Sequence, residues 1–273
     1  MKLPWRSIRL LQRGVHLWLF GFLLSTLPAA EWLWSQPVIP PLPAPPGKLA
    51  WATHAFATWL SPDLALPAVL VLLVLALRSV VLPSRWYITL VEWMLFSSLV
   101  NFSWLAATGG HQLITNVLFW MIFLPVREEQ VEASTTMGPF GVLQRAAFWI
   151  IRLQLLVAYA VTGLLKLTGR FWLAGDAVGI VASDGHFGPA WLAGMPWLAF
   201  LVNYAVLVFQ LTFPVAVWWA HTRRWWMWAG VVFHLGTGFA FNILDMGLAF
   251  LVVYPIWFRE GERSPSSAAR LPQ

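Results

Sequence analysis

Residues 146–167 read AAFWIIRLQLLVAYAVTGLLKL, a run of 22 residues in which Arg152 and Lys166 are the two charged side chains. About 20 predominantly apolar residues are enough for a helix to cross the hydrocarbon core of a bilayer. The run is therefore predicted to be a transmembrane helix. A charge inside such a helix is costly and usually serves a function. This helix is the first place to look for a site.

The composition of the whole chain extends this interpretation. Of the 273 residues, 59% are hydrophobic and 10% are charged, whereas soluble proteins have about 45–50% apolar and about 25% charged residues. A soluble globular domain and a disordered chain are both excluded. At about 20 residues per span, the apolar residues suffice for roughly eight spans. The chain has no cysteine, which excludes disulfides, thiolate nucleophiles and thiolate metal sites.

Hydrophobic runs, separated by charged or glycine- and proline-rich stretches, predict an all-α polytopic bundle of about eight transmembrane helices over residues 1–258. The predicted spans are Gly14–Ala30, Leu64–Leu77 with a possible extension to Leu82, Trp86–Ala107, His111–Val126, Ala146–Leu167, Pro196–Ala220, Trp225–Phe241 and Met246–Phe258. We expect a proline-rich loop at Pro37–Pro46, an interfacial helix at Leu49–Leu60 and an outer loop at Thr168–Trp191 that could re-enter the membrane. Residues 259–273 are predicted to be a disordered cytoplasmic tail.

The basic residues predict the orientation of the bundle. With eight spans and a cytoplasmic N-terminus, the outer side receives two of them, Lys48 and Arg170. The inner side receives Lys2, Arg6, Arg9, Arg13, Arg78, Arg85, Arg127, Arg145, Arg223, Arg224, Arg259, Arg263 and Arg270. This excess follows the positive-inside rule and predicts two cytoplasmic termini. The net charge of +6 therefore indicates membrane orientation and not a nucleic-acid partner.

One face of the helix at residues 146–167 carries its polar residues. Positions 152, 156, 159, 163 and 166 recur at helical spacing, so Arg152, Tyr159 and Lys166 share a face with a gap at Gly163. The glycine would let another helix or a flat ligand approach. Lys166 lies near the outer end, where it could be an anchor that reaches the interface. Alternatively, an amine buried in an apolar bundle loses its proton more easily and can act as a base.

Several other polar residues are predicted to reach the same outer side: His111, Asp176, Asp184, His186, Asn242 and Asp245. His234 lies nearer the middle of its span, where it could bond another helix or take part in catalysis. We expect His111, Lys166 and His234 to line one outer cavity with apolar and aromatic walls. The spacing of His54, His111 and His186 matches no zinc pattern, so no metal is expected.

Three segments resemble the transmembrane domain that vitamin K-dependent gamma-carboxylases share with their bacterial relatives, the HTTM family. The first is Arg152–Gly175, which resembles the family's Gln, Tyr, Gly, Lys, Trp, Gly stretch. The second is Phe233–Gly247, which resembles a Phe-His segment leading into an apolar span with a glycine-containing turn. The third is His111–Pro125, which resembles a short span ending in Phe-Leu-Pro. The resemblance covers the bundle alone, since the carboxylases continue into a large lumenal domain.

The resemblance implies a catalytic role for Lys166. In the carboxylases, a lysine at the matching position is the base that deprotonates vitamin K hydroquinone. Oxygen then adds, and the basic quinone oxide that forms takes a proton from a substrate glutamate. A family histidine implicated in catalysis matches His111. The family's site faces the lumen, which corresponds to the outer side here and agrees with the distribution of basic residues.

We therefore expect an integral protein of a bacterial inner membrane. It would perform quinone-dependent redox or base catalysis at the outer leaflet. Its enzyme class would be a carboxylase-like or epoxidase-like lyase or an oxidoreductase. Lys166 and His111 are the expected catalytic residues. The residues expected to bind the cofactor are Tyr159, Gly163, His234 and Arg152. The cofactor would be menaquinol or vitamin K hydroquinone. Membrane lipid, a membrane quinone and a protein partner are the expected contacts.

Two other functions stay open at this point. The same bundle could serve as a non-catalytic membrane interaction, maturation or immunity subunit. It could also be a small-molecule transporter, although the sequence shows no paired broken helices and no central acidic residue of the kind that transporters use. Lys166 separates the enzyme from the non-catalytic subunit, because an enzyme needs its amine whereas a scaffold tolerates arginine or methionine there.

Overall fold

A computed structural model describes residues 3–35, 60–103, 106–133 and 138–258. The longer helices are α1 (Trp5–Thr26), α3 (Ala65–Val81), α4 (Trp86–Phe102), α5 (Gly109–Met121), α7 (Pro139–Leu167), α11 (Pro196–Ala216), α12 (Ala220–Ala240) and α13 (Leu244–Leu251). The short helices are η1 (Leu27–Ala29), η2 (Glu31–Ser35), η3 (Pro62–Leu64), α6 (Glu128–Ala133), α8 (Arg170–Ala174), α9 (Ala177–Ser183), α10 (Ala190–Ala193) and η4 (Tyr254–Trp257). These ranges contain no strand, which confirms the all-α prediction for them.

Within the described ranges, three helical segments are long and apolar enough to cross a membrane: Trp5–Ala29, Pro139–Leu167 and Pro196–Ala216. Two shorter apolar segments, Ala65–Val81 and Leu244–Trp257, accompany them. Helices α4, α5 and α12 occupy further predicted spans, so the total of eight stays a prediction. Pro139 and Pro196 begin their helices, where a fixed φ is favourable and the missing N–H has no helical partner to lose.

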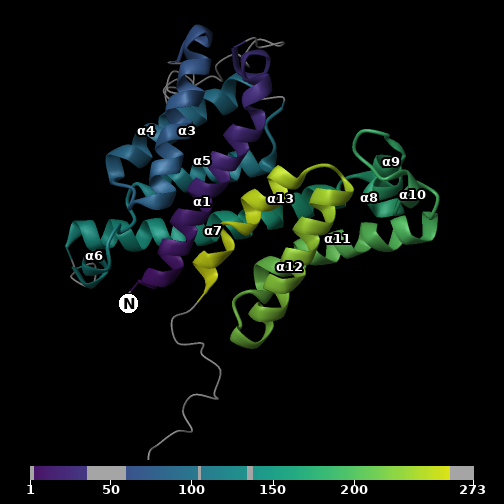
Figure 1. The fold of residues 1–273 in the computed structure, drawn as a ribbon. Coiled ribbons are helices and arrows are strands. Elements are labelled where there is room, and N and C mark those ends of the chain that lie inside the picture. Colours follow the sequence, from purple (N-terminus) through teal and green to yellow (C-terminus); the bar gives the residue numbers. More distant parts are fainter. Residues whose placement is uncertain (1–2, 36–59, 104–105, 134–137, 259–273) are drawn as a thin grey trace, which may run out of the picture.

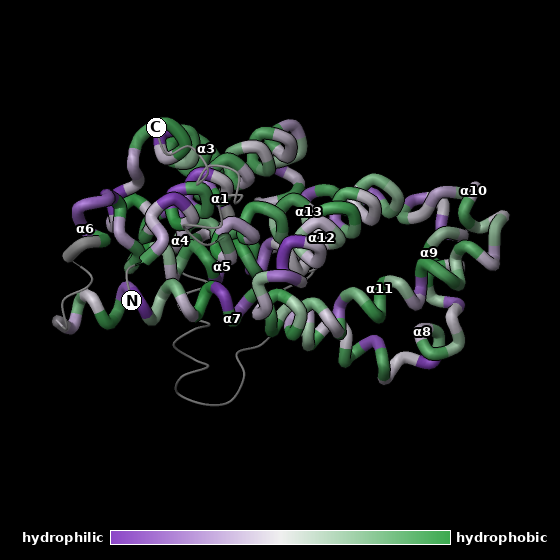
Figure 2. The backbone as a smooth tube through the Cα atoms, turned by 90° about the horizontal axis from the view of Figure 1, so that it is seen from below, coloured by the Kyte–Doolittle hydropathy of each residue, from purple (hydrophilic) through white to green (hydrophobic). Residues whose placement is uncertain are grey.

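The helices form two neighbouring groups (Figure 1). Helix α1 packs on α3, and α4 packs on α5. In the second group α11 packs on α7, and α12 packs on α13. Helices α13 and α5 contact each other and connect the groups, and α5 also contacts α7. Figure 2 shows hydrophobic residues along much of the long helices and hydrophilic ones on α6. One apolar core runs through both groups.

The segment Thr168–Trp191 differs from the predicted loop, because it contains the three short helices α8, α9 and α10. Gly175 ends α8 in a left-handed conformation with φ of 87°, which glycine adopts without strain. Val178 and Ala182 of α9 pack with Leu192 and with Ala199 of α11 in a small separate core. The glycines and aspartates of this segment are typical of a loop, and helices of four to seven residues are too short to show a periodic apolar pattern.

The small helices lie at one end of the molecule, beside the ends of α7 and α11, while α6 and the N-terminus lie at the opposite end (Figures 1 and 2). Three predicted features lie outside the described residues: the proline-rich loop at Pro37–Pro46, most of the interfacial helix at Leu49–Leu60 and the tail at residues 259–273.

Candidate functional site

The polar face of α7 has the composition that the sequence predicted. Arg152, Tyr159 and Gly163 are buried, and Lys166, at the last turn, is half-buried. A Cβ added to Gly163 would lie 3.0 Å from the Leu211 side chain on α11. The glycine therefore serves a close helix–helix approach.

Lys166 lines a cavity of about 450 Å³ between the end of α7, the small helices, α11 and α12. The walls are mainly apolar and aromatic, with Trp172, Val178, Phe233, Phe241 and Met246 among them. The Lys166 Nζ lies 4.9 Å from the centre of the Trp172 ring, a cation–π distance for a protonated amine. The amine is thus at the wall of an apolar cavity, which an anchor in the lipid interface does not require.

Three other polar side chains line this cavity. Gln210 is buried, and its Oε1 has no hydrogen-bond partner among the described residues. Thr237 also lines it, with its hydroxyl donating to the Phe233 carbonyl at 2.7 Å. Asp184 accepts a hydrogen bond from the backbone N–H of His186 at 2.9 Å, and this bond lowers the pKa of the Asp184 carboxyl. The cavity therefore combines an amine, a carboxylate and one acceptor without a partner among the described residues.

A buried hydrogen-bond network connects α7, α12 and η4 beside this cavity. The Tyr159 hydroxyl bonds the Nε2 of His234 and lies 2.6 Å from the Tyr254 hydroxyl. The His234 ring stacks on Phe250 with ring centres 4.9 Å apart. His234 does not line the Lys166 cavity, although Phe233 and Thr237 on the same helix do. Its role in the fold is thus to bond one helix to another.

Arg152 lies on α7 four turns before Lys166 and holds η4. Its Nε donates to the Ile256 carbonyl at 2.9 Å. The guanidinium lies 4.4 Å from the centre of the Phe148 ring and 4.9 Å from that of Trp257. The hydrogen bond to the carbonyl and the contacts with the ring faces stabilise the buried guanidinium charge. Arg152 is not part of the Lys166 cavity.

His111 lies in a different place from Lys166. It lines a small cavity of about 130 Å³ with Phe22, Trp34 and Asp245. Its Nδ1 accepts the Thr108 backbone N–H at 2.8 Å, so that the ring caps the start of α5. Its Nε2 lies 3.6 Å from the Asp245 carboxylate. The expectation that His111, Lys166 and His234 share one cavity is therefore wrong, because α13 and its preceding turn place Asp245 beside His111.

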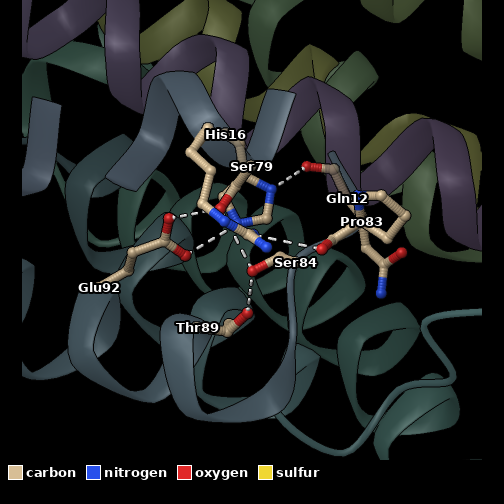
Figure 3. A network of polar contacts seen from close by, with 8 residues as sticks. Gln12, His16, Ser79, Pro83, Ser84, Thr89 and Glu92 are labelled. Atoms are coloured by element: carbon tan, nitrogen blue, oxygen red, sulfur yellow. Dashed lines mark hydrogen bonds and ion pairs between the residues drawn. The ribbon is translucent and has the colours of Figure 1, made fainter. Parts of the chain in front are cut away.

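The structure also contains a buried ionisable pair that the sequence analysis overlooked. His16 on α1 and Glu92 on α4 are fully buried, with His16 Nε2 3.0 Å from Glu92 Oε2 (Figure 3). No central acidic residue was expected, but Glu92 is a buried acidic residue within the predicted span Trp86–Ala107. A search for lone acids as well as lone bases in the apolar segments would have found it.

In the described part of the chain, no three histidine, aspartate or glutamate side chains lie close enough to hold a metal ion. His54 is outside that part. The Lys166 cavity is therefore the main candidate site, and an apolar, partly aromatic molecule with a few polar groups is the ligand that such walls suit.

Comparison with known protein families identifies one domain in this chain. Residues 142–261 match the HTTM domain family, which covers α7 to η4 and so contains the Lys166 cavity. Curated proteins and solved structures give no match. The recognition of an HTTM domain is confirmed, and together with the long apolar helices it identifies an integral membrane protein.

Proposed function

Because residues 142–261 form an HTTM domain of a membrane protein, we propose that the chain is a quinol-dependent enzyme in which Lys166 acts as the base. The observation that carries this proposal is the position of the Lys166 amine on the wall of a cavity of about 450 Å³ with apolar and aromatic walls. A bound menaquinol or vitamin K hydroquinone would supply the redox chemistry and the hydroxyl proton.

The residues of the cavity fit such a ligand. Trp172, Phe233 and Phe241 offer ring surfaces for a flat aromatic group. Gln210 offers a buried Oε1 acceptor without a partner among the described residues, and leaving such an acceptor unpaired is costly. A ligand hydroxyl that donates to this oxygen would satisfy it. These features support a quinol over a purely aliphatic ligand such as an acyl chain.

Lys166 would act as a proton acceptor. As a neutral amine it takes the proton of a ligand hydroxyl: the O–H bond breaks, an N–H bond forms, and the electron pair stays on the ligand oxygen. The ammonium that results lies against the Trp172 ring at 4.9 Å and lines the same cavity as the Asp184 carboxylate. Both neighbours favour the charged product. Tyr159, His234 and Arg152 support the helices that form the walls, and they have no assigned contact with the ligand.

The proposal is tested by blocking the cavity. Val181 lines it and is 40% exposed, whereas Val232 on α12 is 70% exposed and lies outside it. The full chain and the variants Val181→Trp and Val232→Trp are purified in detergent, and the bound quinone is extracted and identified by mass spectrometry. We expect quinone with the wild type and Val232→Trp and its loss with Val181→Trp. Equal quinone in both variants, or none in any sample after menaquinol is added, contradicts the proposal.

A further inference from the structure

A second cavity lies near the end of the molecule that carries α6 and the N-terminus, far from the small helices (Figure 1). It has a volume of about 390 Å³. Its walls come from the first turns of α1, the end of α3 with the turn that follows, and the segment that leads into α6. The mechanism proposed above does not use it.

The floor of this cavity consists of buried polar side chains that hydrogen bonds hold in place. His16, Ser79 and Ser84 line it, and all three belong to the buried network around Glu92 (Figure 3). His16 Nδ1 donates to the Gln12 carbonyl at 2.6 Å, and Ser79 Oγ donates to Glu92 Oε1 at 2.9 Å. Ser84 Oγ lies 2.9 Å from the Thr89 hydroxyl. Because these bonds join α1, α3 and α4, the floor keeps its shape without a ligand.

The walls bring three guanidinium groups together. Arg9 and Arg13 lie one turn apart on α1 and so share a face, and Arg127 comes from the segment before α6. In the described part of the chain, none of these three guanidinium groups has an ion pair or hydrogen bond. Glu128 and Glu129 also line the cavity but pair with none of them. The two carboxylates offset only part of the repulsion among the three guanidinium groups, and the remaining positive charge attracts an anion.

Apolar side chains border the same cavity. Val81 and Leu82, which line it, are 66% and 52% exposed, and Trp5 lines it as well. Arginine forms paired hydrogen bonds with phosphate oxygens, while exposed aliphatic side chains and an indole suit the beginning of an acyl chain. Basic pockets between membrane helices have this combination when they hold lipid head groups.

We propose that this cavity binds a phospholipid, with the phosphate held by Arg9, Arg13 and Arg127 and the acyl chains along Val81 and Leu82. Charge and apolar surface together favour a lipid over a free phosphate ion, because an ion would leave the exposed aliphatic side chains unused. A neutral lipid without phosphate would leave the three guanidinium groups without a paired acceptor.

Native mass spectrometry of the full chain in detergent tests this proposal. The probes are phosphatidylglycerol, diacylglycerol with the same acyl chains, and inorganic phosphate. The variant Arg9→Gln/Arg13→Gln is compared with Arg85→Gln/Arg170→Gln, which loses the same charge at two residues outside this cavity. We expect phosphatidylglycerol to bind the wild type and the control variant alike and to bind the cavity variant about tenfold or more weakly.

Three results would overturn the proposal. Equal binding of phosphatidylglycerol by the two double variants would show that general charge, and not this cavity, attracts the lipid. Equal binding of diacylglycerol and phosphatidylglycerol would remove the role of the phosphate. Full competition by inorganic phosphate would identify a site for a soluble anion. A thermal melt with and without lipid keeps the comparison informative if a variant is less stable, since a ligand that binds the folded protein raises its melting temperature, and tighter binding raises it further.

Discussion

The Tyr159 hydroxyl on α7 hydrogen-bonds the Nε2 of His234 on α12, although 75 residues separate them in the chain. The same hydroxyl lies 2.6 Å from that of Tyr254 in η4. One phenol thus joins α7, α12 and η4 within the residues that match the HTTM domain. Because the whole group is buried, the two hydroxyls and His234 Nε2 depend on one another for partners.

Removing the Tyr159 hydroxyl should destabilise the protein. Tyr159→Phe leaves His234 Nε2 and the Tyr254 hydroxyl with one partner fewer in a buried place, and we expect a loss of about 1–2 kcal/mol. Tyr87→Phe is the matched control, because Tyr87 is 43% exposed. Unfolding of both variants is followed by circular dichroism in the same detergent. If Tyr159→Phe and Tyr87→Phe have the same melting temperature, the network contributes nothing to stability.

Two glycines of α12 should respond differently to the same substitution. A Cβ at Gly230 would overlap the buried Tyr254 hydroxyl, whereas a Cβ at Gly236 meets nothing within 4 Å. Gly230→Ala must displace Tyr254 and should lower the free energy of unfolding by about 1–3 kcal/mol, as overpacked cores do. Gly236→Ala should be neutral or stabilising by up to about 1 kcal/mol, since alanine favours the helix. Thermal unfolding in detergent separates the two, and equal melting temperatures would contradict this packing.

The His16–Glu92 pair should show strong coupling. Both side chains are 0% exposed. Removing one partner leaves the other buried with only its bond to Ser79 or to the Gln12 carbonyl, at a loss of about 3–5 kcal/mol. His16→Leu/Glu92→Leu should lose less than the sum of the two single variants. The double-mutant cycle is measured by thermal or chemical unfolding in detergent. Additive losses would mean that the two residues do not stabilise each other.

Much of the helical architecture could be predicted from the sequence, for identifiable reasons. Long apolar runs specify helices through their length, and helical spacing placed Arg152, Tyr159 and Lys166 on one face of α7. Gly163 was correctly expected at a close approach, and α11 is its partner. These features depend on residues within one helix.

What could not be predicted depends on contacts between distant parts of the chain. His111 and Lys166 were expected in one cavity, but the first turn of α13 puts Asp245 beside His111, and neither residue lines the Lys166 cavity. The partners His16 and Glu92 lie 76 residues apart, so no local pattern connects them. The helices α8 to α10 are stabilised by packing on each other and on α11, not by their own periodicity.

The rate at which the purified protein consumes quinol under air shows whether the Lys166 amine acts as a base. Wild type, Lys166→Ala and Lys166→Arg are compared in one detergent, with menaquinol as substrate. A positioned base contributes about two to four orders of magnitude, and a guanidinium stays protonated. Both variants should therefore lose at least about 99% of the rate. An added small amine should restore part of it in Lys166→Ala. Full activity in Lys166→Arg would instead identify Lys166 as a helix anchor and contradict its role as the base.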